Sequence, residues 1–182
     1  MEAPQCILIL DFGGQYTQLI ARRVRERGVY SCVLPCSAQL ADIRAVQPMG
    51  IIFSGGPASV LDEGAPRVDE GVFELGVPVL GICYGMQLIN DLCGGRVESA
   101  EVREYGHTML CVTDSALFKG VQPETAVFMN HGDRVSVLPK GFTADASTAN
   151  CPIAAFSDVA RGLYCVQFHP EVTHTAFGQQ ML

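Results

Sequence analysis

A cysteine flanked by glycines is the pattern in this sequence with the clearest chemical meaning. Cys83 is the centre of Gly-Ile-Cys-Tyr-Gly at 81–85, between a short apolar stretch and a run that begins at Met86 and can form a helix. Such a turn from strand to helix lifts the central side chain above the sheet, and glycines fit where backbone segments approach closely. The helix N-terminus also favours thiolate over thiol. We therefore predict that Cys83 is a nucleophile rather than a packed thiol.

A histidine followed two residues later by a glutamate can supply the base that such a nucleophile needs. In His169-Pro170-Glu171 the proline favours an extended backbone at His169, and residues two apart in an extended chain point to the same side. Glu171 can then orient the imidazole and stabilise its protonated form. These residues predict a catalytic triad of Cys83, His169 and Glu171.

The other histidines are weaker candidates for the base. His107 follows a predicted turn, and His174 begins the last predicted helix with no acid two residues away. His131 belongs to Asn-His-Gly-Asp at 130–133, which we expect to form a polar turn between two strands. That turn is better suited to recognising a substrate than to accepting a proton.

Acyl transfer from an amide also needs backbone N–H groups that stabilise the oxyanion. We expect one from Tyr84, directly after the nucleophile, and one from Gly56 in Ser-Gly-Gly-Pro at 54–57. A phosphate-binding loop is the alternative for that segment. Pro57 lacks an N–H group, however, and no G-x-x-x-x-G-K-[ST] pattern occurs.

Alternating apolar and amphipathic segments in the N-terminal half predict βαβ units. The expected strands are Cys6–Leu10, Val29–Leu34, Met49–Phe53 and Val77–Ile82. The expected helices are Gln15–Arg27, Leu40–Val46, Pro66–Leu75 and one that begins at Tyr84. We therefore predict a doubly wound α/β fold whose central sheet is mostly parallel, with helices on both faces.

The C-terminal half has a different pattern, in which strand-like runs follow one another with turn residues between them. The runs are Val97–Arg103, His107–Val112, Ala126–Met129, Arg134–Leu138, Phe142–Ala146, Ile153–Phe156 and Gly162–Phe168. This pattern predicts an additional antiparallel hairpin region in a mixed sheet. The last segment, Thr173–Leu182, is expected to be helical.

Composition favours one compact acidic domain. The 182 residues suffice for one core, and the net charge of -7 disfavours a nucleic-acid partner. The arginines at 22, 23, 25 and 27 are interpreted as a solvated helix face. Eight cysteines occur without a C-x-x-C pair or a preceding secretory leader, so we expect a cytoplasmic protein without disulfides, metal or membrane contact.

The motifs together resemble those of the class I, or triad, glutamine amidotransferases. The segments 54–57, 81–87 and 168–171 have the family's order and spacing across most of the chain. Asp-Phe-Gly-Gly-Gln-Tyr at 11–16, Tyr84, His-Gly-Asp at 131–133 and Val-Thr-His-Thr at 172–175 further resemble the glutaminase portion of GMP synthases.

This resemblance implies that glutamine is the substrate and that Gln87, Asn130, Gly132 and Asp133 hold its amino-acid end. It also implies a partner, an ATP pyrophosphatase domain or subunit that uses the ammonia to convert XMP to GMP. ATP and magnesium are expected only in that partner, with no cofactor in this domain. We expect low glutaminase activity until the partner docks.

Other functions remain open on the sequence alone. The chain could serve an amidotransferase of the anthranilate or carbamoyl phosphate type, although those relatives usually have leucine after the cysteine. It could also be a γ-glutamyl hydrolase, a catalytically silent regulatory module or, with less support, a redox sensor built on Cys83.

Overall fold

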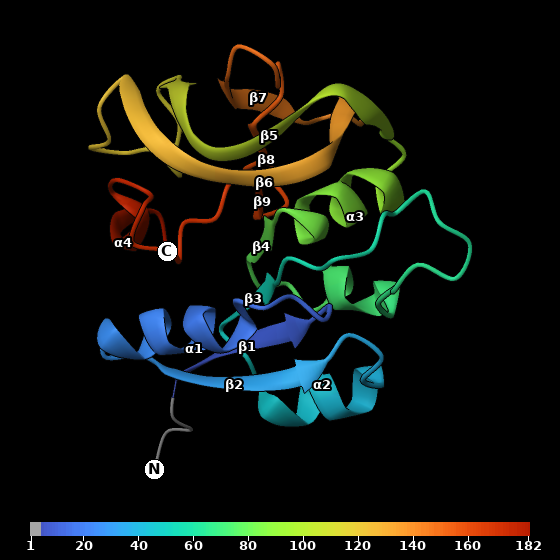
Figure 1. The fold of residues 1–182 in the computed structure, drawn as a ribbon. Helices are drawn as coiled ribbons and strands as arrows, with labels where there is room; N and C mark the ends of the chain where they lie inside the picture. The colour runs from blue at the N-terminus through green and yellow to red at the C-terminus, as the bar shows by residue number, and fades with distance from the viewer. Residues whose placement is uncertain (1–4) are drawn as a thin grey trace.

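The computed structural model describes residues 5–182, and within them nine strands form one mixed sheet in the order β2-β1-β3-β4-β9-β8-β7-β5-β6 (Figure 1). The strands are β1 (Cys6–Asp11), β2 (Tyr30–Pro35), β3 (Gly50–Phe53), β4 (Val79–Ile82), β5 (Arg96–Val112), β6 (Glu124–Val137), β7 (Thr143–Ser147), β8 (Ala155–Asp158) and β9 (Leu163–Val166). The helices are α1 (Thr17–Glu26), α2 (Leu40–Val46), α3 (Tyr84–Leu92), α4 (Gly178–Met181) and the 3-10 helix η1 (Glu70–Glu74).

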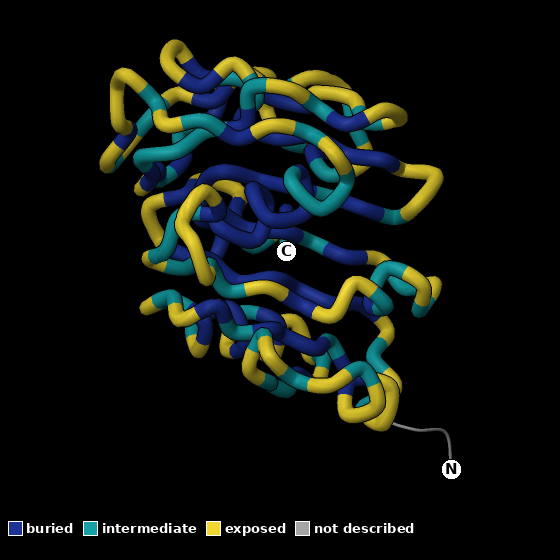
Figure 2. Tube along the Cα trace, turned by 90° about the vertical axis from the view of Figure 1, so that its right-hand side faces the viewer, coloured by how far each residue is buried: buried dark blue, intermediate teal, exposed yellow. Residues whose placement is uncertain are grey.

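The five strands β2, β1, β3, β4 and β9 pair in parallel, and helices cover both of their faces. Alternation along β1 shows how: Leu8 and Leu10 belong to one core cluster, whereas Ile9 belongs to a second cluster. The first cluster includes residues of α2 and α3, and the second includes residues of α1. Residues of β1, β3, β4 and β9 are mostly buried, whereas exposed residues gather in the connections (Figure 2). The predicted doubly wound α/β arrangement is confirmed.

The remaining strands pair antiparallel and extend the same sheet. The long hairpin of β5 and β6 arches over the end of the molecule opposite β1 and β2 (Figure 1). The sequence predicted four short strands where the structure has these two long ones. As a result His131, expected in a turn, lies inside a continuous strand, and so does the segment before His107, where a turn was expected.

Two predicted helices are much shorter than expected. In place of Pro66–Leu75 the chain forms only η1, which Asp69 begins by accepting a hydrogen bond from the N–H of Gly71. In place of Thr173–Leu182 the chain forms only α4, because Phe177 adopts φ 59° and Gly178 lies directly against the backbone of Pro170. A left-handed residue interrupts a right-handed helix, so no helix can run through this point.

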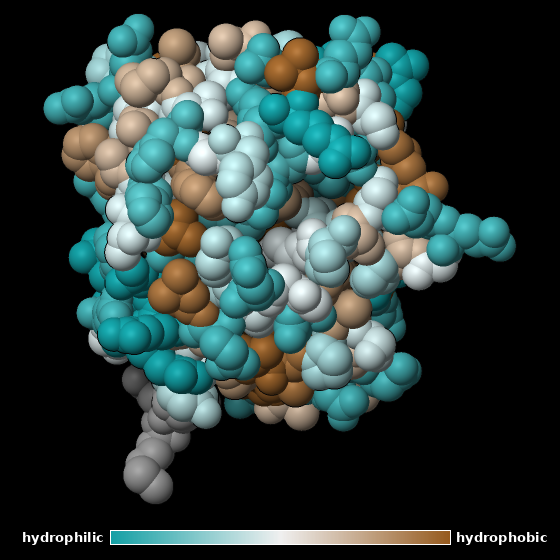
Figure 3. Space-filling model, viewed as in Figure 1, coloured by the Kyte–Doolittle hydropathy of each residue, from teal (hydrophilic) through white to brown (hydrophobic). Residues whose placement is uncertain are grey.

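The surface is mainly hydrophilic on the face of Figure 3, where hydrophobic side chains occur in small separate groups. Within residues 5–182 no helix has both the length and the apolar character needed to cross a membrane.

Candidate active site

Cys83 occupies a sharp turn between β4 and α3. Its backbone has φ 52° and ψ -107°, a conformation rare for a residue with a side chain, and its N–H donates to the carbonyl of Val166 at 2.8 Å. A Cβ added to Gly85 would lie 2.5 Å from the carbonyl oxygen of Phe53, and one added to Gly81 would lie 2.8 Å from the backbone of Gly85. Glycine is thus required on both sides of the cysteine for the backbone to fit.

His169 follows the end of β9, the neighbour of β4 in the sheet. Its N–H donates to the carbonyl of Phe128 at 3.0 Å, and its carbonyl accepts from the hydroxyl of Thr175 at 2.6 Å. Its Nδ1 lies 2.7 Å from Oε1 of Glu171, and both side chains are buried. The backbone and the ring of His169 are therefore both fixed.

The Cys83 thiol and the His169 imidazole contact each other. A Cβ added to Gly55 would lie 3.1 Å from Cε1 of His169 and 3.6 Å from Cβ of Cys83, so both side chains lie against this glycine. Burial is the largest single influence on His169 and disfavours its charge, but hydrogen bonds with Cys83 and Glu171 outweigh it and raise the pKa of His169 to about 10. The imidazole is thus protonated at neutral pH.

Glu171 is anchored from the first helix. The Nε of Arg23 donates to the carbonyl of Glu171 at 2.9 Å, while a guanidinium NH1 pairs with Glu26 at 2.8 Å. Arg25 likewise donates to a backbone carbonyl, that of Ser31. The arginines at 22, 23, 25 and 27 were interpreted as a solvated face; three of them are exposed and Arg23 is partly buried, and Arg23 and Arg25 also hold neighbouring backbone.

A cavity of about 240 Å³ opens beside Cys83 and His169. It is lined by Gly13, Gly14, Gln15, Tyr16, Thr17, Gly55, Gly56, Pro57, Cys83, Asn130 and His169. The loops after β1 and β3 thus form much of its wall. This is the edge of a parallel sheet where strand order reverses, the usual place for a ligand in such folds.

The loop after β1 is the part of the site that sequence reasoning missed. Residues 11–16 served only as a family marker, although they follow the carboxyl end of a predicted strand next to that of β3. Asp11 Oδ1 accepts from the N–H of Gly13 and the hydroxyl of Thr17, which orders the loop. The Tyr16 ring then packs edge-on against His169, with ring centroids 5.3 Å apart. The position of the loop at the strand end could have revealed it.

The two expected oxyanion donors have free N–H groups. No hydrogen bond among residues 5–182 uses the N–H of Gly56 or Tyr84, whereas the next N–H, of Gly85, donates to Ser54. Gly56 lines the cavity beside Cys83. A Cβ on Gly56 would lie 2.6 Å from the carbonyl oxygen of Phe12, so this position also needs glycine.

The expected substrate-binding residues do not all reach the cavity. Asn130 lines it, and its carbonyl faces the Cys83 sulfur at 3.7 Å, but Gln87, Gly132 and Asp133 are not among the lining residues. The amide nitrogen of Gln87 donates to the carbonyl of Asp133 at 3.0 Å and to Gln167 at 3.1 Å. The carboxylate of Asp133 accepts from the hydroxyls of Ser59 and Ser99.

All eight cysteines lie within residues 5–182 and are free thiols. Several are packed in the core, where burial raises the pKa of Cys151 to about 12 and that of Cys165 well above its ordinary value. These thiols stay neutral at physiological pH. They are packed groups, as the sequence reasoning expected for most of the cysteines other than Cys83.

Comparisons with known proteins agree with this geometry. The family described as "Glutamine amidotransferase class-I" matches residues 8–182. GMP synthase [glutamine-hydrolyzing] of Ruminiclostridium cellulolyticum is 56% identical over 98% of this chain and 35% of that protein, and the enzyme of the same name from Caldanaerobacter subterraneus is 52% identical over the same shares. The chain thus spans about a third of the length of these relatives.

Solved structures of related proteins have the same fold as this chain. A protein from Thermoplasma acidophilum, described as one subunit of a GMP synthase, matches with a TM-score of 0.85 at 33% identity, over 100% of this chain and 92% of that chain. A glutamine amidotransferase from Thermotoga maritima shares the fold, with a TM-score of 0.74 at 20% identity over 94% of this chain and 78% of that chain. With the family match, these likenesses show that the chain belongs to the class I glutamine amidotransferases.

Proposed function

We propose that this chain hydrolyses the side-chain amide of glutamine and releases ammonia and glutamate. The observation that carries this proposal is the Cys83 turn: a cysteine held at φ 52° contacts a buried imidazole whose far nitrogen is bound by Glu171. A packed structural thiol needs neither the unusual backbone nor a histidine–glutamate partner. Membership in the amidotransferase family supports glutamine as the amide.

The reaction would proceed through a thioester. The Cys83 sulfur attacks the amide carbon, and the oxyanion that forms accepts hydrogen bonds from the N–H groups of Tyr84 and Gly56. His169 donates its proton to the leaving nitrogen, so the carbon–nitrogen bond breaks and ammonia departs. His169 then removes a proton from water, which attacks the thioester carbon and releases glutamate and the cysteine sulfur. Glu171 keeps the imidazole oriented throughout.

For the amino-acid end of glutamine we propose two kinds of contact. Asn130 and the loop 13–17 would touch the substrate directly, because both line the cavity. Gln87, Gly132 and Asp133 would act mainly by holding that wall, because the amide of Gln87 and the carboxylate of Asp133 already have protein partners.

The test is glutamate release by Cys83→Ala. Loss of the nucleophile is expected to lower kcat by at least about 1,000-fold. Cys111→Ala is the matched control, because Cys111 is an exposed thiol far along β5 and should leave the rate unchanged. Mass spectrometry should also find a diazoketone analogue of glutamine bound covalently at Cys83. Labelling elsewhere, or glutamate release that survives Cys83→Ala, would refute the proposal.

We further propose that the ammonia serves a synthetase partner that aminates XMP to GMP. The relatives at 52–56% identity are named GMP synthases, and about two thirds of their length lies outside the region matched here. ATP and magnesium would bind in that partner. The free thiols fit a cytoplasmic location. Adding the synthetase with ATP and XMP should raise glutamate release several-fold and yield GMP, and equal rates with and without it would exclude this coupling.

A further inference from the structure

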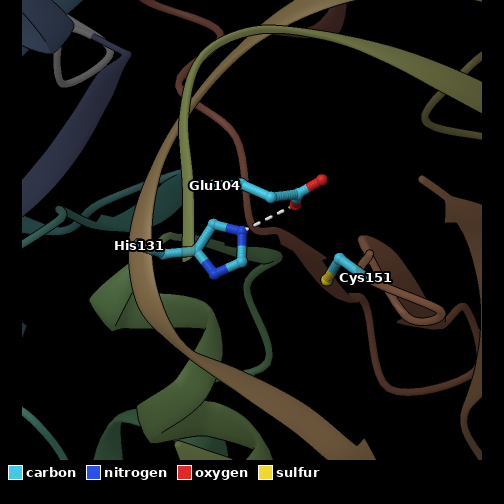
Figure 4. A group of neighbouring side chains, drawn as sticks. All are labelled: Glu104, His131 and Cys151. Carbon is cyan, nitrogen blue, oxygen red and sulfur yellow. Dashed lines mark hydrogen bonds and ion pairs between the residues drawn. The ribbon is translucent and has the colours of Figure 1, made fainter. Parts of the chain in front are cut away.

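Outside the catalytic triad, a second buried cluster of reactive side chains lies beneath the antiparallel hairpin. It consists of Glu104 on β5, His131 on β6 and Cys151 in the loop before β8 (Figure 4). All three are buried, and their ligand-type atoms lie within 4.8 Å of one another. Nothing in the proposed triad chemistry uses them. A buried charged group without solvent must have a specific partner, so the hydrogen bonds of the cluster indicate its role.

Both ring nitrogens of His131 face oxygen acceptors. Its Nδ1 lies 2.8 Å from the carbonyl oxygen of Asp133, and its Nε2 lies 2.9 Å from Oε2 of Glu104. The other carboxylate oxygen of Glu104 accepts from the hydroxyl of Thr148 at 2.7 Å. A neutral imidazole could donate to only one of its two acceptors. The carbonyl of Asp133 can only accept, so Nδ1 is a donor, and the contact between Nε2 and a carboxylate is charge-assisted.

The pair lies where the β5–β6 ladder is irregular. Ser99 pairs with Asp133 and Glu104 pairs with His131, so residues 100–103 face Gly132 alone. A bulge of this kind removes ladder hydrogen bonds and redirects side chains, often beside active sites. Within the segment 130–133, Asn130, His131 and Asp133 keep ladder partners, and only Gly132 has none among the pairs described for residues 5–182. Glu104, the ladder partner of His131 at the edge of the bulge, adds a buried side-chain contact that helps to hold this segment.

That same segment forms the wall beside the nucleophile. Asn130 lines the cavity, and its carbonyl lies 3.7 Å from the Cys83 sulfur. The carbonyl of Asp133 accepts from both His131 and Gln87, and Gln87 lies on the helix that begins at Cys83. A continuous set of hydrogen bonds therefore joins Glu104 to the helix that carries the nucleophile.

We infer that Glu104 and His131 are positioning residues for glutamine: their bond fixes the segment 130–133, and with it the wall against which the substrate's amino-acid end binds. The inference rests on the proposed glutaminase function. It assigns no chemical step to either residue. Breaking the bond should therefore weaken binding of glutamine-like molecules while leaving the Cys83 sulfur reactive.

A metal ion at the same three residues is the competing interpretation. The nitrogen–oxygen separation of 2.9 Å between His131 and Glu104 suits one shared proton, whereas two ligands about 2.1 Å from a tetrahedral zinc ion lie farther apart. The Cys151 thiol donates to the carbonyl of Ile153 at 3.4 Å, and burial together with the charge of Glu104 raises its pKa to about 12. Both observations favour a neutral thiol over a metal-bound thiolate.

Two substitutions of Glu104 separate the effect of its side-chain length from the effect of its charge. Glu104→Asp keeps the charge but is one methylene too short to bond His131, whereas Glu104→Gln keeps the reach and can donate to a neutral His131. His131→Asn is a second way to break the bond, since its amide can occupy the Nδ1 position but cannot reach Glu104. Glu98→Asp is the matched control, because Glu98 is a half-exposed residue on the same strand that pairs with Arg134 across the hairpin.

Each variant is alkylated at Cys83 with the diazoketone analogue of glutamine and, separately, with iodoacetamide, which needs no amino-acid site. For Glu104→Asp and His131→Asn we expect the half-saturating concentration of the analogue to rise about tenfold, the loss of roughly one charge-assisted hydrogen bond, with iodoacetamide rates unchanged. Glu104→Gln and Glu98→Asp should stay within about twofold of the parent. The half-saturating concentration is a property of the folded molecules and does not depend on their fraction, so either bond-breaking variant that folds decides the result.

The inference is overturned if the bond-breaking variants bind the analogue normally, or if Glu104→Gln loses as much affinity as they do. It is also overturned if the purified protein holds one equivalent of zinc by elemental analysis that Glu104→Asp lacks. Failure of the glutaminase proposal is distinguishable, because the parent protein itself would then show no saturable alkylation by the analogue.

Discussion

The two halves of the sheet each contain a buried glutamate–histidine pair, and the pairs differ in what the second ring nitrogen faces. In the parallel half, Nδ1 of His169 binds Glu171 while the opposite side of the ring faces Cys83 and the cavity. In the antiparallel half, both nitrogens of His131 are occupied by protein oxygens. In the roles that we propose, the same residue types serve chemistry where the second nitrogen faces a cysteine and a cavity, and serve position where both nitrogens face protein oxygens.

The largest difference between the two pairs is expected when Glu171 and Glu104 are each replaced by glutamine. Glu171→Gln removes the charge that stabilises the His169 imidazolium and should lower kcat for glutamate release by about 1,000-fold. Glu104→Gln should change kcat by less than about twofold, because its amide can still bond both neighbours. Steady-state glutamate release measures both. Equal losses would mean that the two pairs have the same role.

A smaller effect is expected when a glycine in each half of the sheet is replaced by alanine. Gly85→Ala forces a Cβ to 2.5 Å from the carbonyl oxygen of Phe53 and should lower the free energy of unfolding by about 3 kcal/mol. Gly106→Ala, on β5 at φ 97° with open space around it, should cost only the backbone strain of about 1 kcal/mol. Urea titration followed by circular dichroism measures both losses. Similar losses in the free energy of unfolding would mean that the close backbone contact at Gly85 costs no more than the left-handed backbone at Gly106.

The charge on His169 makes a pH-dependent contribution to stability. Its pKa is about 10 in the folded protein against an ordinary 6.5, so its stabilising contribution is complete below 6.5 and is lost as pH rises through 10. The stability advantage of the parent over His169→Gln should therefore shrink between pH 7 and pH 10. Cys83→Ala removes one partner that raises the pKa of His169, so the stability advantage should be lost over a narrower pH range in that variant. Urea midpoints across pH test this, and an advantage that grows with pH would contradict it.

The smallest expected effect concerns the support of Glu171 from α1. Arg23→Ala removes the donor to the Glu171 carbonyl and should lower kcat about fivefold, the loss expected for one hydrogen bond of about 1 kcal/mol. Arg22→Ala is the control, because Arg22 is exposed and contacts only Glu26 among the ion pairs described for residues 5–182. Glutamate release by the two variants gives the comparison. Equal rates would show that the support is dispensable.

Local rules made the parallel half predictable. The strand at 79–82 and the glycine-flanked cysteine depend on residues close in sequence, and the strand predictions there lie close to the observed bounds. The His-Pro-Glu segment was expected to be extended, but Pro170 and Glu171 form a turn that still brings Glu171 to the His169 ring. The loop at 13–17 was missed as a cavity wall, because its place beside β3 arises from the strand order rather than from any residue within it.

The antiparallel half was less predictable for a physical reason. Whether Asn130–Asp133 forms a turn or continues a strand depends on pairing with residues about 30 positions away, and the bulge at 100–103 decides which side chains face inward. Neither the long-range pairing nor the bulge produces a recognisable pattern among residues that are close in sequence. Glu104 therefore had no signal in the sequence beyond being an acidic residue in a predicted strand gap.

The adjacency of β4 and β9 has a consequence for how this domain can vary. The ladder that pairs Ile82 with Val166 fixes the spacing between Cys83 and His169, so the chain from α3 to β8 is, for that spacing, one long insertion between two neighbouring strands. Exposed connections within it can change length without altering the distance between Cys83 and His169. The surface of this insertion can therefore be remodelled while Cys83 and His169 keep their relative positions.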